Sequence, residues 1–216
     1  MKIDIQNNNK FPYLLIDNWF TEPELKNIWK EIDFFTIQNK LIKSSETKEV
    51  AISNNKKPLA NNFRVSPFNH YSDLGYKTSP IANSLNKIQN KDFHSLVNKT
   101  FDDTDTALAN VFLGTNQSTS IISYYEKDND YKEHFDQQQF TMITWLYKEP
   151  KNFTGGDFYF TKNNTKIECV SNRTILFPGY YYHSVEPVKI IDTTRKNSGR
   201  FSISTFFYTI PETHGN

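Results

Sequence analysis

The sequence predicts an α+β fold, in which N-terminal helices support a sandwich or barrel of antiparallel strands. In several segments of the first half, apolar residues recur with the period of a helix, whereas from about residue 117 they recur with a period of two. A chain of 216 residues suits one domain. We therefore expect a single domain over residues 1–216, with a helical buttress and a possible lid over 1–115 and the strand core over 116–210.

Composition limits the class of protein. The 25 Lys and Arg residues nearly balance the 24 Asp and Glu residues, so charge gives no sign of a nucleic-acid or anionic membrane partner. A single cysteine, Cys169, excludes an internal disulfide and indicates a reducing compartment. The first residues lack the pattern of a signal peptide, and no apolar run approaches a membrane span. We expect a cytoplasmic protein.

The N-terminal segment predicts a strand followed by a helix. "FPYLLIDNWF", residues 11–20, has the pattern of an opening strand and turn. In "TEPELKNIWKEIDFF", residues 21–35, Thr21 and Glu24 form a capping box and Pro23 falls in the tolerated first turn. An apolar stripe then recurs at helical spacing through Leu25, Ile28, Trp29 and Ile32. We expect this stripe to pack in the core.

Residues 38–78 are polar and interrupted, and they are long for a plain connection. Two interpretations remain open. The segment is either a disordered insertion or a functional lid, in which the side chains of Phe63, Arg64, Phe68 and Tyr71 could contact a bound peptide.

The rest of the chain continues the division into helices and then strands. A second helix is expected to begin at Ser79-Pro80, and a third to cover 93–101. After residue 117, short alternating segments separated by turn residues predict successive strands: "STSIISYYE", "QFTMITWLYK", "GDFYF", "TKIECV", "RTILF", "YYHSVEPV" and "RFSISTFFYTI".

A histidine and an aspartate stand two residues apart in "YKEHFDQQQF". In an extended strand, His134 and Asp136 would point the same way and could converge on a metal ion. The alternative is a surface histidine beside a solvated aspartate. His183, 47 residues after Asp136, would complete a set of two histidines and one carboxylate, the ligand set of non-heme Fe(II) oxygenases. Zinc could use the same ligands.

Arg200 and Ser202 share one face of the strand "GRFSIS". A guanidinium buried in a sheet interior needs a partner, and a dicarboxylate cosubstrate would supply it through a two-pronged ion pair. The alternative is an arginine on an edge strand in solvent.

Taken together, these segments resemble the Fe(II)/2-oxoglutarate-dependent dioxygenase superfamily, in particular its prolyl 4-hydroxylase-like members. The resemblance rests on "YEKDNDYKEHFD", "FTMITWLY", "GGDFYF", "NRTILFPGYYYHSVEPV" and "GRFSIS", in the family's order, and on the opening "PYLLIDNWFTEPE". It leaves out roughly residues 38–115. It implies a double-stranded β-helix, or jelly-roll, core with N-terminal buttressing helices.

The resemblance also implies the roles of individual residues. It implies His134, Asp136 and His183 as iron ligands and Arg200 as the anchor of the distal carboxylate of 2-oxoglutarate. Further cosubstrate-lining residues implied by it are Ser202, Tyr125 and Trp145. The cofactor would be Fe(II), with 2-oxoglutarate and O2 as cosubstrates, ascorbate as an accessory reductant, and succinate and CO2 as coproducts.

The sequence departs from the family's pattern at the anchor. Collagen-type members have lysine at the position of Arg200. Other members of the family have arginine there, as this chain does. The connection from Pro187 to Gly199 is longer than usual and contains Arg195 as a rival anchor. The strand pattern around Arg200 favours Arg200.

The leading substrate on resemblance is a peptidyl proline, followed by another protein side chain or a free amino acid. Two rival functions stay open. One is a cupin-like metal enzyme that does not use 2-oxoglutarate. The pair of Arg200 and Ser202 argues against it, because such an enzyme needs no anchor for a dicarboxylate. The other is a non-catalytic jelly-roll binding module, against which the presence of all three ligands and the anchor in one chain argues.

Overall fold

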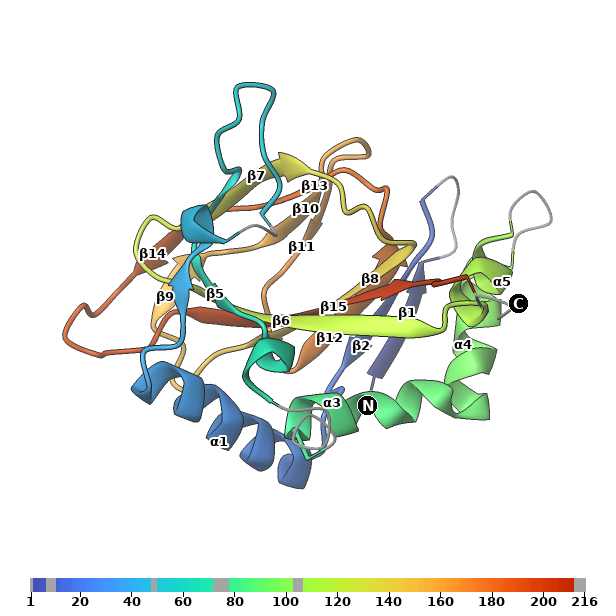
Figure 1. Ribbon diagram of the computed structural model, residues 1–216, viewed down its shortest axis with the longest axis horizontal. Coiled ribbons are helices and arrows are strands. Elements are labelled where there is room, and N and C mark those ends of the chain that lie inside the picture. The colour runs from blue at the N-terminus through green and yellow to red at the C-terminus, as the bar shows by residue number, and fades with distance from the viewer. Residues whose placement is uncertain (1, 7–10, 48–49, 72–77, 103–106, 212–216) are drawn as a thin grey trace, which may run out of the picture.

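Two antiparallel sheets face each other, and helices lie against the outer face of the larger sheet (Figure 1). The computed structural model describes residues 2–6, 11–47, 50–71, 78–102 and 107–211. Among these residues, no helix is long and apolar enough to cross a membrane. The division into helices and strands confirms the α+β class expected from the sequence.

The larger sheet carries the floor of the site described below. In spatial order it contains β1 (Lys2–Gln6), β2 (Tyr13–Asp17), β12 (Arg173–Pro178), β8 (Phe140–Leu146), β15 (Arg200–Tyr208), β6 (Gln117–Tyr125), β5 (Phe63–Val65) and β3 (Ile42–Lys43). The smaller sheet contains β11 (Thr165–Ile167), β10 (Phe158–Phe160), β13 (His183–Val185), β7 (Asp130–His134) and β4 (Ala60–Asn61). A separate pair is formed by β14 (Val188–Ile190) and β9 (Phe153–Gly155).

The helices form the buttress that the sequence predicts. Among the described residues they are α1 (Glu22–Ile37), α3 (Pro80–Ser84), α4 (Lys91–Phe101) and α5 (Leu108–Leu113), with short 3-10 segments η1 (Ser44–Glu46), η2 (Pro67–His70) and η3 (Leu85–Gln89). The capping box of α1 is present, because the Thr21 backbone N–H donates to Glu24 Oε2 at 2.7 Å. The short α5 was not predicted, since six residues are too few for a helical period to be recognised.

Strand alternation separates two apolar clusters. On β15, Phe201, Ile203 and Phe207 face the helices and join the first cluster, together with Ile28 and Phe35 of α1. The second cluster lies between the sheets, where Phe158 contacts Trp145 and Phe177 from the opposite sheet. Ser202 and Ser204 of β15 point to this inner side and line a cavity. The inner face therefore has both an apolar part and a polar part.

The polar segment 38–78 is ordered over its described residues, 38–47, 50–71 and 78. Its strand β5 pairs with β6 of the larger sheet, and β4 pairs with β7 of the smaller one. Backbone hydrogen bonds therefore hold this segment, although its side chains are too polar to predict strands. Phe63 packs on the first cluster, Tyr71 donates to Glu31 Oε1 at 2.9 Å, and Phe68 is 51% exposed. Of the four side chains named for a lid, Arg64 is the one that lines the inner cavity.

Candidate active site

A cavity of about 430 Å³ opens between the two sheets. Its floor comes from β6, β15 and β8, and its opposite wall comes from β7, β10 and β13. His134, Asp136 and His183 line it, and so do Arg200 and Ser202. Both groups of residues singled out in the sequence thus meet in one space.

The three candidate metal ligands converge. His134 ends β7 and His183 begins β13, and the two residues are direct cross-strand partners. The Nε2 atoms of His134 and His183 lie 3.8 and 3.7 Å from the carboxylate oxygens of Asp136. One ligand atom from each residue fits within 4.8 Å of the others. Within the described part of the chain, this is the one cluster of three or more such residues that could hold a metal ion.

Asp136 reaches this position in a different way from the one predicted. The expectation that Asp136 belongs to the same strand as His134 is wrong, because β7 ends at His134 and Asp136 lies in the loop that follows. The two side chains nevertheless converge, as predicted. The backbone N–H of Asp136 donates to the Gly179 carbonyl at 2.8 Å, and Thr141 Oγ1 donates to Asp136 Oδ2 at 2.6 Å. A contact between two loops and a neighbouring hydroxyl therefore orient the carboxylate.

Gly179 allows this loop contact. A Cβ atom at Gly179 would lie 2.0 Å from the Gln138 carbonyl oxygen, which is backbone that cannot move aside cheaply. Only glycine permits so close an approach. This glycine belongs to the quoted segment "FPGYYYH", but its partner loop could not be inferred from the sequence.

Hydrogen bonds fix which nitrogen of each histidine faces the cavity. His134 Nδ1 lies 2.8 Å from the Lys132 carbonyl, and His183 Nδ1 lies 2.8 Å from the Tyr181 carbonyl. A carbonyl only accepts, so each Nδ1 carries the proton and each Nε2 keeps a free lone pair beside the Asp136 carboxylate, where one cation would be bound by all three groups. Burial, and then the nearby His183 ring, lower the pKa of His134 to about 2. Neutral imidazoles of this kind fit a divalent metal ion.

Aromatic rings hold both imidazoles in place. The Tyr131 ring stacks on His134 at 3.6 Å between centroids, and the Phe158 ring stacks on His183 at 5.2 Å. His70 and His94 lie elsewhere, on η2 and α4. His214 falls outside the described residues.

Arg200 is a buried cation that forms no ion pair with any acidic group of the described residues. Its side chain is 1% exposed, and Nε and Nη1 have no hydrogen-bond partner among the described residues. Its guanidinium carbon lies 4.6 Å from the centroid of the Tyr125 ring. A cation at such depth is costly unless an anion meets it. The donors therefore fit a ligand carboxylate inside the cavity, as 2-oxoglutarate would provide.

The remaining predicted site residues divide into two groups. Ser202 and Tyr125 line the cavity, as the resemblance implies. Trp145 shares the inner face of β8 with the cavity residues Thr141 and Ile143, but it is fully buried in the second cluster and does not line the cavity. Its contact with the cosubstrate therefore stays a prediction, which the present cavity lining does not support.

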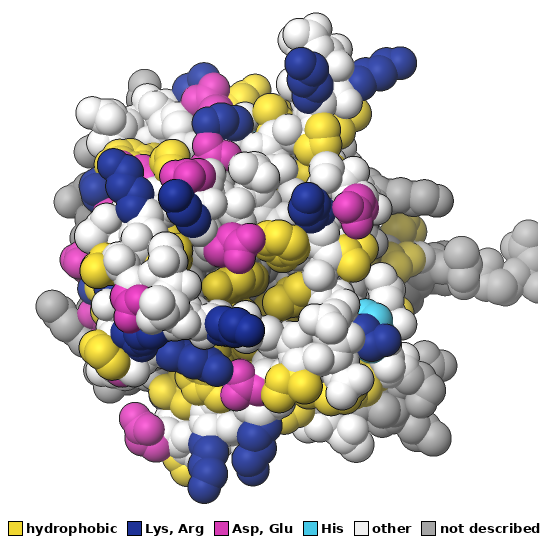
Figure 2. All heavy atoms as spheres, turned by 90° about the vertical axis from the view of Figure 1, so that its left-hand side faces the viewer, with side chains coloured by type: hydrophobic (Ala, Val, Ile, Leu, Met, Phe, Trp, Pro, Cys, Tyr) yellow, Lys and Arg dark blue, Asp and Glu magenta, His cyan; other side chains and the backbone are white. Residues whose placement is uncertain are grey.

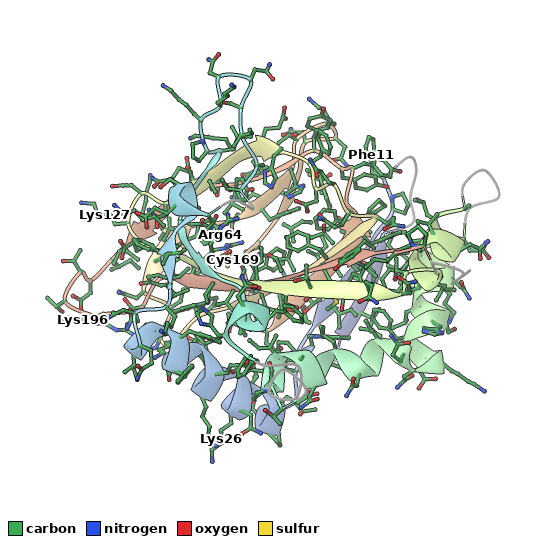
Figure 3. All side chains as sticks on the ribbon, viewed as in Figure 1. Phe11, Lys26, Arg64, Lys127, Cys169 and Lys196 are labelled. Carbon is green, nitrogen blue, oxygen red and sulfur yellow. The ribbon has the colours of Figure 1, made fainter. Side chains whose placement is uncertain are left out.

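The rival anchor Arg195 lies on the connection before β15. Its Nη1 donates to the Pro150 carbonyl at 3.1 Å, and it does not line the cavity. The cavity also contains Arg64, which Figure 3 shows in the interior between the sheets, as it does Cys169, whereas Lys26, Lys127 and Lys196 project outward. From the sequence, Arg64 was a candidate only under the lid interpretation of residues 38–78, and Thr141 was not a candidate at all. The only sequence feature that pointed to Arg64 was the polar segment around it. No sequence feature pointed to Thr141.

Comparison with known families agrees with this geometry. Residues 120–208 match the model of the 2OG-Fe(II) oxygenase superfamily. The chain carries a 2OG-Fe(II) oxygenase domain. This family implies Fe(II) as the metal and 2-oxoglutarate and O2 as cosubstrates, and it confirms the predicted enzyme class over the two rival functions.

Solved structures of similar fold include two prolyl hydroxylases. A prolyl-4-hydroxylase from Pseudomonas putida has a TM-score of 0.58 at 12% identity, over 92% of this oxygenase and 93% of that chain. A prolyl hydroxylase from Trichoplax adhaerens, in complex with a hypoxia inducible factor oxygen degradation domain peptide fragment, has a TM-score of 0.59 at 12% identity, over 91% and 83%. These likenesses confirm the double-stranded β-helix.

A putative oxygenase from Shewanella oneidensis also shares the fold, with a TM-score of 0.53 at 13% identity, over 93% of this oxygenase and 83% of that chain. A search of the curated proteins finds no match.

Proposed function

We propose that this oxygenase hydroxylates a C–H bond of a peptide, with a peptidyl proline as the leading substrate. In this proposal His134, Asp136 and His183 bind Fe(II), and Arg200 binds the distal carboxylate of 2-oxoglutarate. Ser202 and Tyr125 lie beside that carboxylate. The observation that carries the proposal is the buried Arg200 guanidinium, which lines the same cavity as the three ligands.

The chain's own residues would organise the reaction. When bound, Fe(II) with 2-oxoglutarate and O2 supplies the oxidative step, which yields succinate, CO2 and a hydroxylated carbon. The Thr141 hydroxyl keeps one Asp136 oxygen oriented, and the two backbone carbonyls keep both Nε2 atoms directed inward. Arg200 orients the cosubstrate by a two-pronged ion pair. The rings of Tyr131 and Phe158 exclude water from the imidazoles.

Support for a peptide substrate comes from the fold likeness. The Trichoplax adhaerens neighbour was solved with a bound peptide fragment, and the Pseudomonas putida neighbour is also a prolyl hydroxylase.

The decisive experiment measures succinate formed from 2-oxoglutarate with Fe(II), with and without ascorbate, across a panel of proline-containing peptides. We expect peptide-dependent succinate and a gain of one oxygen atom in the peptide by mass spectrometry. Peptides in which other side chains replace the proline form the comparison set. Succinate without peptide oxidation, for every peptide tested, would contradict the substrate proposal and leave the oxygenase class intact.

A further inference from the structure

Two exposed aromatic side chains border the active-site cavity. Phe135 stands between the proposed ligands His134 and Asp136, and Tyr182 comes directly before His183. Their rings meet edge to face, with centroids 5.4 Å apart. Phe135 is 47% exposed and Tyr182 is 40% exposed. This pair of rings, here called the aromatic rim, has no role in the proposed chemistry.

The register of two strands places the aromatic rim beside the ligands. The strands β7 and β13 are antiparallel, with His134 opposite His183. One residue further along, Phe135 and Tyr182 therefore lie opposite each other, just beyond the two imidazoles. Phe135 also lines the active-site cavity, whereas Tyr182 does not. The aromatic rim thus continues the cavity from the proposed ligands onto the molecular surface.

Contacts with neighbouring side chains hold Tyr182 but leave Phe135 open. Lys162 Nζ lies 4.4 Å from the centroid of the Tyr182 ring and 3.2 Å from Glu133 Oε1. The ammonium group therefore packs against Tyr182, and its charge is balanced by the Glu133 carboxylate. Among the described residues, Phe135 contacts no aromatic ring other than that of Tyr182. Nearly half of the Phe135 surface is thus accessible to a ligand.

The surroundings of the aromatic rim suit an uncharged part of a peptide. Gln137 and Gln138 follow Phe135 in the same loop and line the cavity. Their side-chain amides can donate to and accept from a peptide backbone. Charge does not distinguish a competing binding face in Figure 2, where Lys and Arg alternate with Asp and Glu. Exposed rings beside a cavity are typical of a binding surface, and pairs of rings attract each other beyond the area that they bury.

We propose that the aromatic rim binds an aromatic side chain of the peptide substrate, close in sequence to the hydroxylated residue. The inference rests on the proposed function and adds a sequence preference to it. The hydroxylated residue has to reach the ligands, and Phe135 is covalently joined to two of them. A ring bound at Phe135 therefore belongs to a near neighbour of the hydroxylated residue in the substrate. This ring would contact the open side of Phe135 and the edge of the pair that Phe135 forms with Tyr182.

Peptide binding tests this inference separately from turnover. The probes are fluorescein-labelled peptides with one central proline in a background of alanine and serine. A single phenylalanine is placed in turn at each of the three positions before and after the proline, and a matched set carries leucine instead. Fluorescence anisotropy is measured without O2 on the enzyme loaded with Mn(II) and 2-oxoglutarate, so that no turnover occurs.

We expect phenylalanine to bind about fivefold more tightly than leucine at one position or at two adjacent positions, and equally elsewhere. A preference for phenylalanine that is the same at every position would indicate general adhesion of aromatic peptides and would overturn the inference. So would equal binding of the phenylalanine and leucine peptides throughout.

Two variants locate the preference to the aromatic rim. Phe135→Leu keeps an apolar side chain but removes the ring, and it should abolish the preference for phenylalanine. Tyr182→Leu should weaken this preference. The readout is the ratio of the two peptide affinities within one variant, so a general loss of metal or peptide affinity cancels. Phe34→Leu is the matched control and should keep the preference, because Phe34 is 49% exposed on α1 and does not line the cavity. An unchanged preference in Phe135→Leu or Tyr182→Leu would overturn the inference.

Turnover separates the two levels of the proposal. Succinate formation that depends on proline peptides but is indifferent to their aromatic residues would overturn the role of the aromatic rim alone. No peptide oxidation with any sequence, despite position-dependent binding of the phenylalanine peptides, would instead contradict the proposed reaction.

Discussion

At the scale of single residues, the candidate site depends on hydrogen bonds that act on the proposed ligands from outside the ligand set. The carbonyls of Lys132 and Tyr181 orient the two imidazoles, and Thr141 orients the carboxylate. Second contacts of this kind are worth roughly 10- to 100-fold in metal affinity at other sites. Arg200 differs, since two of its donors, Nε and Nη1, have no hydrogen-bond partner among the described residues.

The first prediction concerns the proposed iron ligands. His134→Ala, Asp136→Ala and His183→Ala should each abolish 2-oxoglutarate turnover and weaken Fe(II) binding at least about 100-fold, because each removes one of three ligands. Circular dichroism should remain that of the folded protein. His94→Ala, on α4, is the control and should keep full activity. Near-normal Fe(II)-dependent activity in any of the three variants would show that the ligand assignment is wrong.

The second prediction concerns the anchor. Arg200→Ala should raise the 2-oxoglutarate concentration needed for half-maximal succinate formation by at least about 100-fold, since a buried ion pair that loses one partner costs several kcal/mol. Arg195→Ala should change it less than about threefold, because Arg195 contacts a backbone carbonyl outside the cavity. The reverse pattern would assign the anchor to the longer connection before β15.

At the scale of elements, the segment that contains β4 and β5 adds a strand to each sheet and contributes side chains to the cavity. The strand β5 extends the larger sheet beside β6, while β4 extends the smaller sheet beside β7. Both strands are two or three residues long and lie near the sheet edges, so their hydrogen bonds are expected to open more readily than those of β8 or β15. Arg64 on β5 and Ser66 just after it face the cavity.

The third prediction follows from this placement. Hydrogen exchange with Fe(II), an inert 2-oxoglutarate analogue and a turned-over peptide should show new protection over 60–71, because a bound peptide would restrict opening of β4 and β5. The strand β1, at the far edge of the larger sheet, provides the internal control and should exchange equally in both samples. Unchanged exchange over 60–71 would leave this segment outside substrate recognition.

At the scale of the whole molecule, stability and function draw on different faces of the larger sheet. The helices cover its outer face (Figure 1) and contribute to the first apolar cluster. The inner face lines the cavity and carries polar side chains there. Removing a cavity residue therefore leaves the first cluster intact. This separation explains why ligand variants are expected to fold, and it makes ligand binding visible as added stability.

The fourth prediction uses that linkage. A ligand that binds only the folded state at 100 times its Kd adds about 2.7 kcal/mol to the free energy of unfolding. Mn(II) together with an inert 2-oxoglutarate analogue should therefore raise Tm beyond the effect of Mn(II) alone. Arg200→Ala should keep the Mn(II) effect and lose the increment from the analogue, whereas His183→Ala should lose both. An increment from the analogue that survives in Arg200→Ala would contradict the anchor assignment.

Much of this arrangement was determined by the sequence alone. The sequence predicted the capping box and apolar stripe of α1, the change of period near residue 117, and the order of the site segments. These features could be predicted because local hydrogen bonds and the burial of one face repeat along the chain. The convergence of His183 with the His134 and Asp136 segment was also predicted, but the sequence did not specify how: the structure makes His134 and His183 cross-strand partners within one sheet.

Tertiary structure decided what depends on close approach between distant segments. Asp136 is oriented by the Gly179 loop and Thr141 rather than by strand alternation, and Trp145 lies in the second cluster rather than in the cavity. Arg64 entered the site because β5 found a hydrogen-bonding partner in β6. Pairing between short strands depends on backbone geometry and hardly on the side-chain pattern. A polar stretch can therefore add a strand to a sheet although its own sequence does not predict a strand.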